Sequence, residues 1–376
     1  MFSYWEQQTF LSTFDIAIIG SGIVGLNAAI DLRQRYPQAR IAVLERGILP
    51  TGASTKNAGF ACFGSVSELL ADLETQSADE VYNLVLRRYK GLLALRQRLG
   101  EQDIEFYQHG NYEIFTPKDS LLYQKCVEKI PELNQILKEV LGVDNVFQPK
   151  NELIAALGLS QVENLIWNSA EGQLHTGKMM RKLLFTAQSM GIQVLNSVEI
   201  ESLESEPDRV ILKTKNFSTL SARKVLVATN GFARQLLPHL AVQPARNQVL
   251  VTAPVPNLKL QGCFHQDEGY IYFRNIDGRV LIGGGRNTAL ETESTAEFGL
   301  TAHIQNYLEN ILFTHILPNQ KVSIEYRWAG ILGLGEGKKP IIENVTDNVI
   351  AAVRMGGMGV AIGILVAQDA VNLIEL

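Results

Sequence analysis

The segment FDIAIIGSGIVG, residues 14–25, decides the fold class of this chain. Phe14–Ile19 is a short apolar run typical of a buried strand, and residues 23–36 continue with apolar or small residues at helical spacing. Between strand and helix stand three glycines, Gly20, Gly22 and Gly25. In such a turn the first glycine permits the tight bend, the second lets the backbone approach a pyrophosphate, and the third lets the helix pack on the strand. The pattern predicts a dinucleotide-binding βαβ unit.

A second apolar strand, Ile41–Leu44, is followed directly by Glu45. Glu45 comes about 20 residues after Gly25, where a carboxylate accepts hydrogen bonds from the adenosine ribose and repels the 2′-phosphate of NADP. The N-terminus of the intervening helix offers free N–H groups and a positive dipole to phosphates. The residues predicted to hold the nucleotide here are Gly20, Ser21, Gly22, Ile23, Gly25, Glu45 and Arg46. An ordinary glycine turn is the alternative interpretation.

Two later segments favour FAD over NAD. Residues 225–231, VLVATNG, form an apolar strand that ends in a polar turn, and residues 356–360, GGMGV, open the last predicted helix. Small residues before a helix let the backbone touch a planar ligand, and the helix N-terminus stabilises negative charge on it. Each segment alone also fits an ordinary strand end or glycine turn. The residues predicted to contact the cofactor here are Thr229, Asn230, Gly231, Gly357, Met358, Gly359 and Val360.

Composition limits the other possibilities. The chain has 376 residues, 46% of them hydrophobic, and a net charge of −5, which indicates a globular protein and argues against nucleic-acid binding. The three cysteines lie far apart, without the spacing of metal ligands, so no metal site is predicted. No segment has the pattern of a signal peptide or a membrane span, so we expect a cytoplasmic protein. The oligomeric state stays open.

These motifs together resemble the D-amino-acid-oxidase-type (DAO) superfamily of FAD-dependent oxidoreductases, which includes glycine, sarcosine and gamma-glutamylputrescine oxidases. The resemblance runs from about Phe14 to the C-terminus and is weakest over residues 103–172. It implies an α/β fold in which a Rossmann-like FAD-binding domain is interleaved with an antiparallel-sheet substrate domain. We expect the first domain to comprise residues 1–100, 150–245 and 335–376, and the second residues 101–149 and 246–334.

The resemblance also extends the predicted cofactor site. Residues 52–59, GASTKNAG, resemble the loop that follows the ribose acid in these enzymes, which implicates Ser54, Lys56, Asn57 and Gly59. Residues 191–203 resemble the segment beside the adenine, which implicates Ile200. The family lacks one fixed mode of flavin attachment. We predict non-covalent FAD, because residues 327–335 contain no cysteine and the early loop contains no histidine.

The reaction that the resemblance implies is oxidation of a C–N bond in a small amine or amino acid. A hydride passes from carbon to flavin N5, the imine hydrolyses, and oxygen or another acceptor takes the electrons. The candidates for the substrate side are Tyr270, Tyr272, Arg274 and Arg327. The first three alternate along one predicted strand and so share a face. The alternatives are a tyrosine cluster on a half-exposed strand and, for Arg327, a structural ion pair.

The sequence departs from the family at the residues that grip a substrate carboxylate. Leu332, Gly357 and Ala361 stand where relatives place an arginine or a lysine. We therefore favour an amine, or an amino acid held by unusual contacts, with Arg354 as a possible replacement anchor and His175 as a helix-terminal contact or pocket residue. Alternatives are a 2-hydroxy acid or tRNA-modification-type flavin reaction and, less favoured, an NAD-dependent dehydrogenase.

Overall fold

A computed structural model of the chain describes residues 1–216, 219–318 and 320–376. Its first sheet contains the predicted βαβ unit: β1 (Phe14–Ile19) pairs in parallel with β2 (Ile41–Leu44), and α2 (Ile23–Arg35) connects them. On its other side β1 pairs in parallel with β11 (Leu220–Val227). The remaining strands of this sheet are β8 (Gln193–Leu195), β9 (Ile200–Ser205), β10 (Val210–Thr214), β17 (Ile341–Asn344) and β18 (Val349–Val353).

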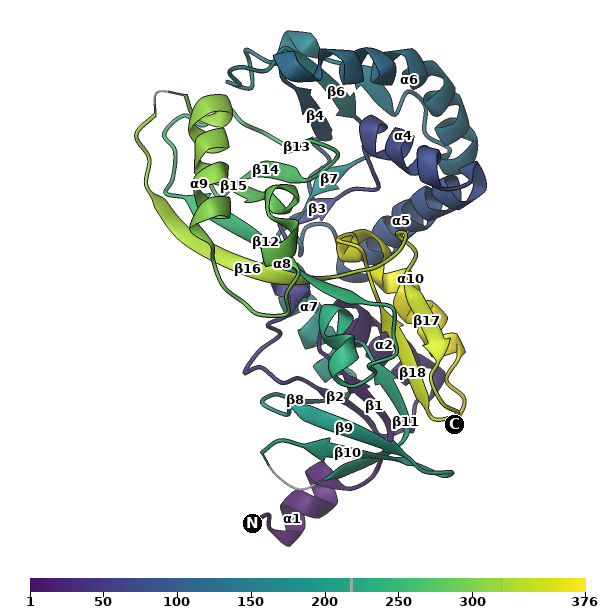
Figure 1. Cartoon of the computed structure of the whole chain (residues 1–376). Helices are drawn as coiled ribbons and strands as arrows, with labels where there is room; N and C mark the ends of the chain where they lie inside the picture. The colour runs from purple at the N-terminus through teal and green to yellow at the C-terminus, as the bar shows by residue number, and fades with distance from the viewer. Residues whose placement is uncertain (217–218, 319) are drawn as a thin grey trace.

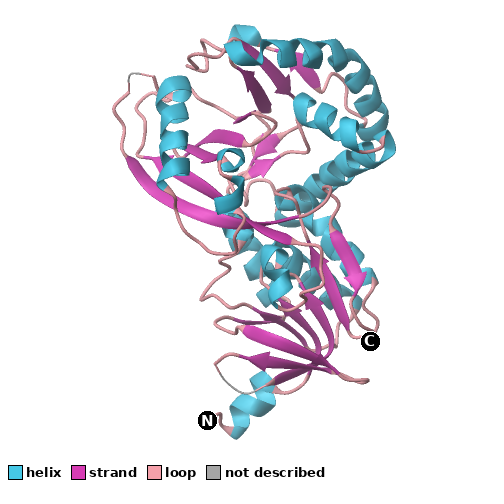
Figure 2. Ribbon diagram, in the orientation of Figure 1, coloured by secondary structure: helices cyan, strands magenta, loops and turns pink. Residues whose placement is uncertain are grey.

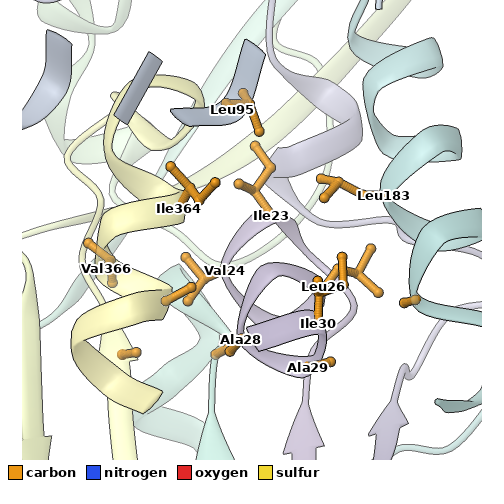
Figure 3. Close-up of a cluster of buried hydrophobic side chains, with 14 of the residues drawn as sticks. Ile23, Val24, Leu26, Ala28, Ala29, Ile30, Leu95, Leu183, Ile364 and Val366 are labelled. Carbon is orange, nitrogen blue, oxygen red and sulfur yellow. The ribbon is translucent and has the colours of Figure 1, made fainter. Parts of the chain in front are cut away.

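One face of the first sheet is covered by a layer of helices (Figure 1). This layer contains α2, α5 (Ala78–Leu99), α7 (Thr176–Ser189) and α10 (Gly359–Asn372). Figure 3 shows their interface, in which side chains of α2 meet Leu95, Leu183 and Ile364 from the other three helices. Because this contact joins segments from both ends of the chain, it fixes the first and last predicted cofactor motifs on one framework.

The second sheet lies at the other end of the molecule (Figure 2). Its strands, in spatial order, are β16 (Ile324–Leu334), β12 (Gln243–Thr252), β15 (Arg279–Gly284), β14 (Ile271–Ile276), β13 (Cys263–Gln266), β4 (Asn111–Phe115), β6 (Asn164–Asn168) and β5 (Phe147–Pro149). Helix α9 (Ala302–Ile311) packs on one face of this sheet and leaves the other face toward the first sheet.

Two more helices pack beside the second sheet. Helices α4 (Val66–Thr75) and α6 (Ser120–Leu141) pack near β5 and β6. The remaining short helices and strands are α1 (Tyr4–Glu6), α3 (Ala53–Lys56), α8 (Leu290–Glu293), β3 (Phe60–Ala61) and β7 (Gly172–Gln173). No helix in the described part of the chain is long and apolar enough to cross a membrane.

The mixed α/β architecture with a parallel nucleotide-type sheet and a mainly antiparallel second sheet confirms the predicted fold class. One range in the predicted division does not fit the pairing. Strand β6 lies within residues 150–245, which we assigned to the FAD-binding part, but it pairs with β4 in the second sheet. Residues 294–301 leave α8 as an extended connection, and α9 begins at Ala302.

Candidate functional site

A cavity of about 710 Å³ runs between the two sheets. Its volume falls within the range of about 300 to 1,000 Å³ that is usual for ligand pockets. One end is lined by Gly20, Glu45 and Ile200 at the carboxyl edge of the parallel sheet, and the other by Tyr270 and Tyr272 of the second sheet. In α/β folds that edge is where nucleotides bind, so the cavity connects the predicted nucleotide site with the predicted substrate face.

Glu45 is held at the nucleotide end by backbone and side-chain donors. Ser21 donates its N–H and its hydroxyl to one carboxylate oxygen over 3.2 and 2.7 Å, and the N–H of Gly47 donates to the other over 2.9 Å. A carboxylate oxygen accepts more than one hydrogen bond, so the side chain keeps capacity for a ribose hydroxyl. Ser21 is fully buried and does not line the cavity, and its two hydrogen bonds orient Glu45.

The glycine turn leaves no room for larger residues. Gly20 has φ of 107°, a conformation that favours glycine. A Cβ added to Gly25 would lie 1.9 Å from the carbonyl oxygen of Gly20, which shows how closely α2 approaches the turn. Gly25 therefore acts through packing, while Gly20, Gly22 and Ile23 line the cavity itself.

The early loop lies along the middle of the cavity, where Ser54, Lys56 and Asn57 line its wall. The Ser54 hydroxyl accepts from the N–H of Ile23 at the start of α2 over 2.9 Å. The Lys56 carbonyl accepts from Nε1 of Trp328 over 3.0 Å, which ties the loop to the second sheet. Gly59 does not line the cavity, because it packs against the Leu174 carbonyl with φ of 76°.

Asn230 joins the end of β11 to the segment before α10. Its side-chain oxygen accepts from the N–H groups of Arg354 and Met355, both over 3.1 Å. Thr229 and Asn230 line the cavity, whereas Gly231 packs against the Leu332 carbonyl. After Met355 the chain turns through two glycines with positive φ and enters α10, and this turn lines the cavity from Met355 to Ala361.

These features fit FAD. The nucleotide end offers a glycine cradle and an oriented carboxylate, as the ribose and pyrophosphate require. The buried hydroxyl oxygen of Thr229 has no hydrogen-bond partner among the described residues, although it stands beside the cavity. A buried polar atom of this kind is normally satisfied by a bound group, so Thr229 has an unused position for the cofactor.

The wall opposite the cofactor segments is a continuous face of the second sheet. His265, Tyr272 and Gly283 are cross-strand neighbours on β13, β14 and β15. A Cβ at Gly283 would lie 2.6 Å from the Tyr272 ring, so glycine makes the space that this ring occupies. The ring also contacts Phe60 edge-on with centroids 5.7 Å apart, and Asn247 donates to the Tyr272 hydroxyl over 3.4 Å.

His265 is the buried polar residue of this wall. Its side chain is 8% exposed, and its Nε2 has no partner among the described residues. Burial lowers the pKa of His265 to about 4, because the charged imidazolium loses hydration. Close by on β4, the Asn111 side-chain oxygen is also buried and without a partner within the described chain. Both residues line the cavity, but these two unpartnered atoms are themselves enclosed by protein atoms.

Arg274 and Arg327 do not occupy the positions that we expected. Arg274 is buried and donates to the carbonyl oxygens of Ala58, Gly59 and Leu174 over 3.2, 3.0 and 2.7 Å, so its guanidinium supports the early loop instead of meeting substrate. Arg327 is exposed on β16, outside the cavity, and donates to Glu309 and Gln305 of α9. Neither arginine lines the cavity.

Two further residues are placed by the structure. Arg354 lies outside the cavity and donates to the carbonyl oxygens of Lys339 and Ala241, so it is not a replacement anchor. His175 is the N-cap of α7, where its ring nitrogen accepts from the N–H of Lys178 over 3.3 Å. This arrangement agrees with the helix-terminal interpretation of His175.

Sequence reasoning missed a charged cluster that lines the cavity. Lys338, in the loop before β17, donates to Glu68 and Asp72 of α4 over 2.8 and 2.9 Å. Burial alone would raise the pKa of Glu68, but Arg88 and Lys338 keep it below its ordinary value. The two acids lie four residues apart on one helix face, a spacing visible in the sequence, but their lysine partner is remote in the chain and gave no signal.

Two buried glutamates hold the segment that leads into α4. Glu171 accepts from the N–H groups of Phe63 and Gly64 over 2.6 and 2.9 Å, and Glu113 accepts from the hydroxyls of Ser65 and Ser67. Burial raises the pKa of each glutamate to about 7, because the low-dielectric surroundings disfavour the charged carboxylate. Among the residues that the structure describes, no group of side chains is arranged to bind a metal ion.

A family model described as "DAO: FAD dependent oxidoreductase" matches residues 15–373. The chain belongs to this family of FAD-dependent oxidoreductases. It is therefore an FAD-dependent oxidoreductase, which confirms the cofactor predicted from the glycine turn and Glu45.

Several relatives resemble this DAO-family chain over most of its length. A probable oxidoreductase, OrdL, of Rhizobium meliloti is 25% identical over 92% of the chain and 79% of that protein. Glycine oxidase of Geobacillus kaustophilus is 25% identical over 85% and 81%. L-2-hydroxyglutarate dehydrogenase of Escherichia coli is 20% identical over 74% and 65%. The crystal structure of the Geobacillus glycine oxidase matches with a TM-score of 0.76 at 20% identity, covering 97% of this chain and 96% of that one.

Proposed function

We propose that the protein oxidises the C–N bond of a small amine or amino acid, using non-covalently bound FAD. The observation that carries this proposal is the sheet wall of Tyr272, Asn247 and neutral His265, which faces the cofactor segments across one cavity. The first sheet with its helices is the FAD-binding part, and the second sheet is the substrate-binding part. The absence of cysteine from residues 327–335 supports non-covalent attachment.

Bound FAD supplies the two-electron acceptor that takes a hydride from the substrate carbon. The amine nitrogen loses a proton as the C=N bond forms, and water then adds to release a carbonyl product and ammonia or an amine. Oxygen or another acceptor finally takes the two electrons. The residues of this chain hold the reacting carbon over the cofactor segments and restrict its orientation, which is the main contribution a protein makes to such a reaction.

His265 contributes orientation without adding charge. A neutral imidazole accepts a hydrogen bond through one ring nitrogen, and His265 lines the cavity opposite Tyr272. An amine must be neutral to release a hydride from its α-carbon. The side chain therefore binds the amine N–H in the neutral form that the reaction needs, and an imidazolium there would oppose the developing positive charge on the product.

A second candidate is oxidation of a 2-hydroxy acid, which the relative named L-2-hydroxyglutarate dehydrogenase favours. The two functions separate in an anaerobic reduction screen. FAD-loaded protein is mixed with amines, amino acids and 2-hydroxy acids while the flavin absorption is followed. Bleaching by an amine or amino acid, with release of ammonia or an amine, is the expected result. Bleaching by hydroxy acids alone would replace the first function with the second, and bleaching by no compound would contradict both.

A further inference from the structure

Arg286 lines the rim of the cavity, where β15 ends. It follows Gly285, whose φ of 76° turns the chain out of the strand. The half-buried guanidinium lies over the ring of Tyr270, with its central carbon 5.4 Å from the ring centroid. No hydrogen bond or ion pair to this guanidinium is present among residues 1–216, 219–318 and 320–376. The position thus combines a cation, a cavity and an aromatic support.

The other cations that line the cavity are placed differently. Arg46 stands at the nucleotide end, over the ring of Phe232. Lys56 lies on the early loop over Phe298, and Lys338 is neutralised by Glu68 and Asp72. Among the described residues that line the cavity, Arg286 is therefore the cation that contacts Tyr270 of the second sheet and has no acidic partner.

An arginine in this position is suited to an anion. Its planar guanidinium presents parallel N–H donors that match a carboxylate, and stacking on an aromatic ring fixes the plane in which these donors point. A cation that is partly withdrawn from water also gains more from a charged partner than an exposed one does. Tyr270 thus orients Arg286 so that its donors remain available to a ligand in the cavity.

The strand geometry separates this cation from the proposed reaction centre. Tyr270 and Tyr272 lie two residues apart, which is about 7 Å along a strand at about 3.4 Å per residue. His265 lies opposite Tyr272, whereas Arg286 covers Tyr270 at the rim, where Tyr270 directly follows the exposed residues Glu268 and Gly269 in the sequence. A ligand that reaches both places needs several bonds between its amine and its anionic group.

We propose that Arg286 binds an acid group at the far end of the substrate, so that the substrate class is amines whose carboxylate is separated from the reacting carbon by several bonds. This inference rests on the proposed function, and it assigns the anion contact to the end of β15. That place differs from β16, where Leu332 occupies the position at which relatives carry an arginine.

The test uses FAD-loaded protein and non-reacting probes, so that it does not depend on turnover. Acetate, butanoate and hexanoate are titrated against their matched amides, and the change in flavin absorption reports binding. Butanoate and hexanoate should bind more tightly than their amides. Arg286→Gln should weaken carboxylate binding about tenfold or more, since a hydrogen bond to a charged group contributes about 1.5 to 3 kcal/mol. Arg286→Lys should retain part of the affinity.

Arg327→Gln is the matched control, because Arg327 lies outside the cavity in an ion pair with Glu309. Amides that bind as tightly as the carboxylates, or carboxylate binding that survives Arg286→Gln, would overturn the inference. Variants are compared at equal FAD content and equal thermal stability, with Arg286→Lys replacing Arg286→Gln if the latter fails to load FAD. Selective carboxylate binding without any amine-dependent bleaching would refute the proposed function alone, whereas bleaching that is unchanged in Arg286→Gln would refute the inference alone.

Discussion

His265 on β13 lies directly opposite Tyr272 on β14, and both side chains line the cavity. The pair forms the centre of the sheet wall that faces the cofactor segments. His265 is the only one of the two that titrates in the acidic range, because burial raises the pKa of Tyr272 well above its ordinary value and lowers that of His265 to about 4. Both groups are therefore neutral between about pH 5 and 8.

His265→Asn should reduce the rate of flavin reduction by the best amine about tenfold to a hundredfold, since it removes one positioned hydrogen bond at the reacting nitrogen. The shape of the pH profile between pH 5 and 8 should not change, because the protonation state of His265 does not change in that range. Stopped-flow reduction at several pH values measures both. A profile that loses an ionisation between pH 5 and 8 in the variant would show that His265 titrates there and contradict its assignment as neutral.

Glu45→Gln should weaken FAD binding about tenfold or more, because a neutral amide gives a weaker hydrogen bond to the ribose than a carboxylate does. The amide also turns a donor toward the hydroxyl of Ser21 or the N–H of Gly47 in one of its orientations. Fluorescence titration of apoprotein with FAD measures the affinity. Glu204→Gln, at an exposed position of β9, is the control and should bind FAD as the unmodified protein does. Equal affinity in Glu45→Gln would exclude Glu45 as the ribose contact.

Gly25→Ala should destabilise the fold by about 1 to 3 kcal/mol, the usual cost of forcing a methyl group into a packed interior. The added Cβ would meet the Gly20 carbonyl oxygen at 1.9 Å, so α2 must move away from the glycine turn. Gly52→Ala is the matched control, because a Cβ there has nothing within 4 Å. Urea unfolding of the two apoproteins measures the difference. Equal stability of both variants would mean that the close approach of α2 to the turn is not required.

The nucleotide end was predictable because its determinants are local. The glycine spacing and the acid after the second strand lie within residues 14–45, and β1, β2 and the start of α2 follow the sequence pattern. Arg274 was misjudged for a related reason: strand alternation correctly put it on the face of Tyr272, but its long side chain reaches the carbonyl groups of the early loop. Strand alternation predicts the face of the sheet on which a side chain lies, but it does not predict the groups that this side chain contacts.

The substrate end depends on contacts that no local pattern contains. Lys338 meets Glu68 through a loop far along the chain, and Arg286 adjoins Tyr270 only because β15 pairs with β14. Arg327 was a candidate for the substrate side, but strand alternation turns it to the α9 face while Trp328 contacts the early loop. Such assignments need the strand pairing, which one sequence does not provide.

Glu113→Gln should change how stability depends on pH. Burial raises the pKa of Glu113 from its ordinary 4.5 to about 7, so between these values the folded protein retains a proton that the unfolded chain has released. More protons bound in the folded state mean that the contribution of Glu113 is fully present below about pH 4.5 and is lost as the pH rises toward 7.

The uncharged glutamine of Glu113→Gln resembles the protonated side chain and does not titrate. The free energy of unfolding of the variant, relative to the unmodified protein, should therefore rise as the pH increases from about 4.5 to 7 and level off above that. Urea unfolding at pH 4.5, 5.5, 6.5 and 7.5 measures this difference, with exposed Glu204→Gln as the control. A difference that stays constant over the range would mean that the Ser65 and Ser67 hydroxyls stabilise the carboxylate of Glu113 enough to cancel the effect of its burial.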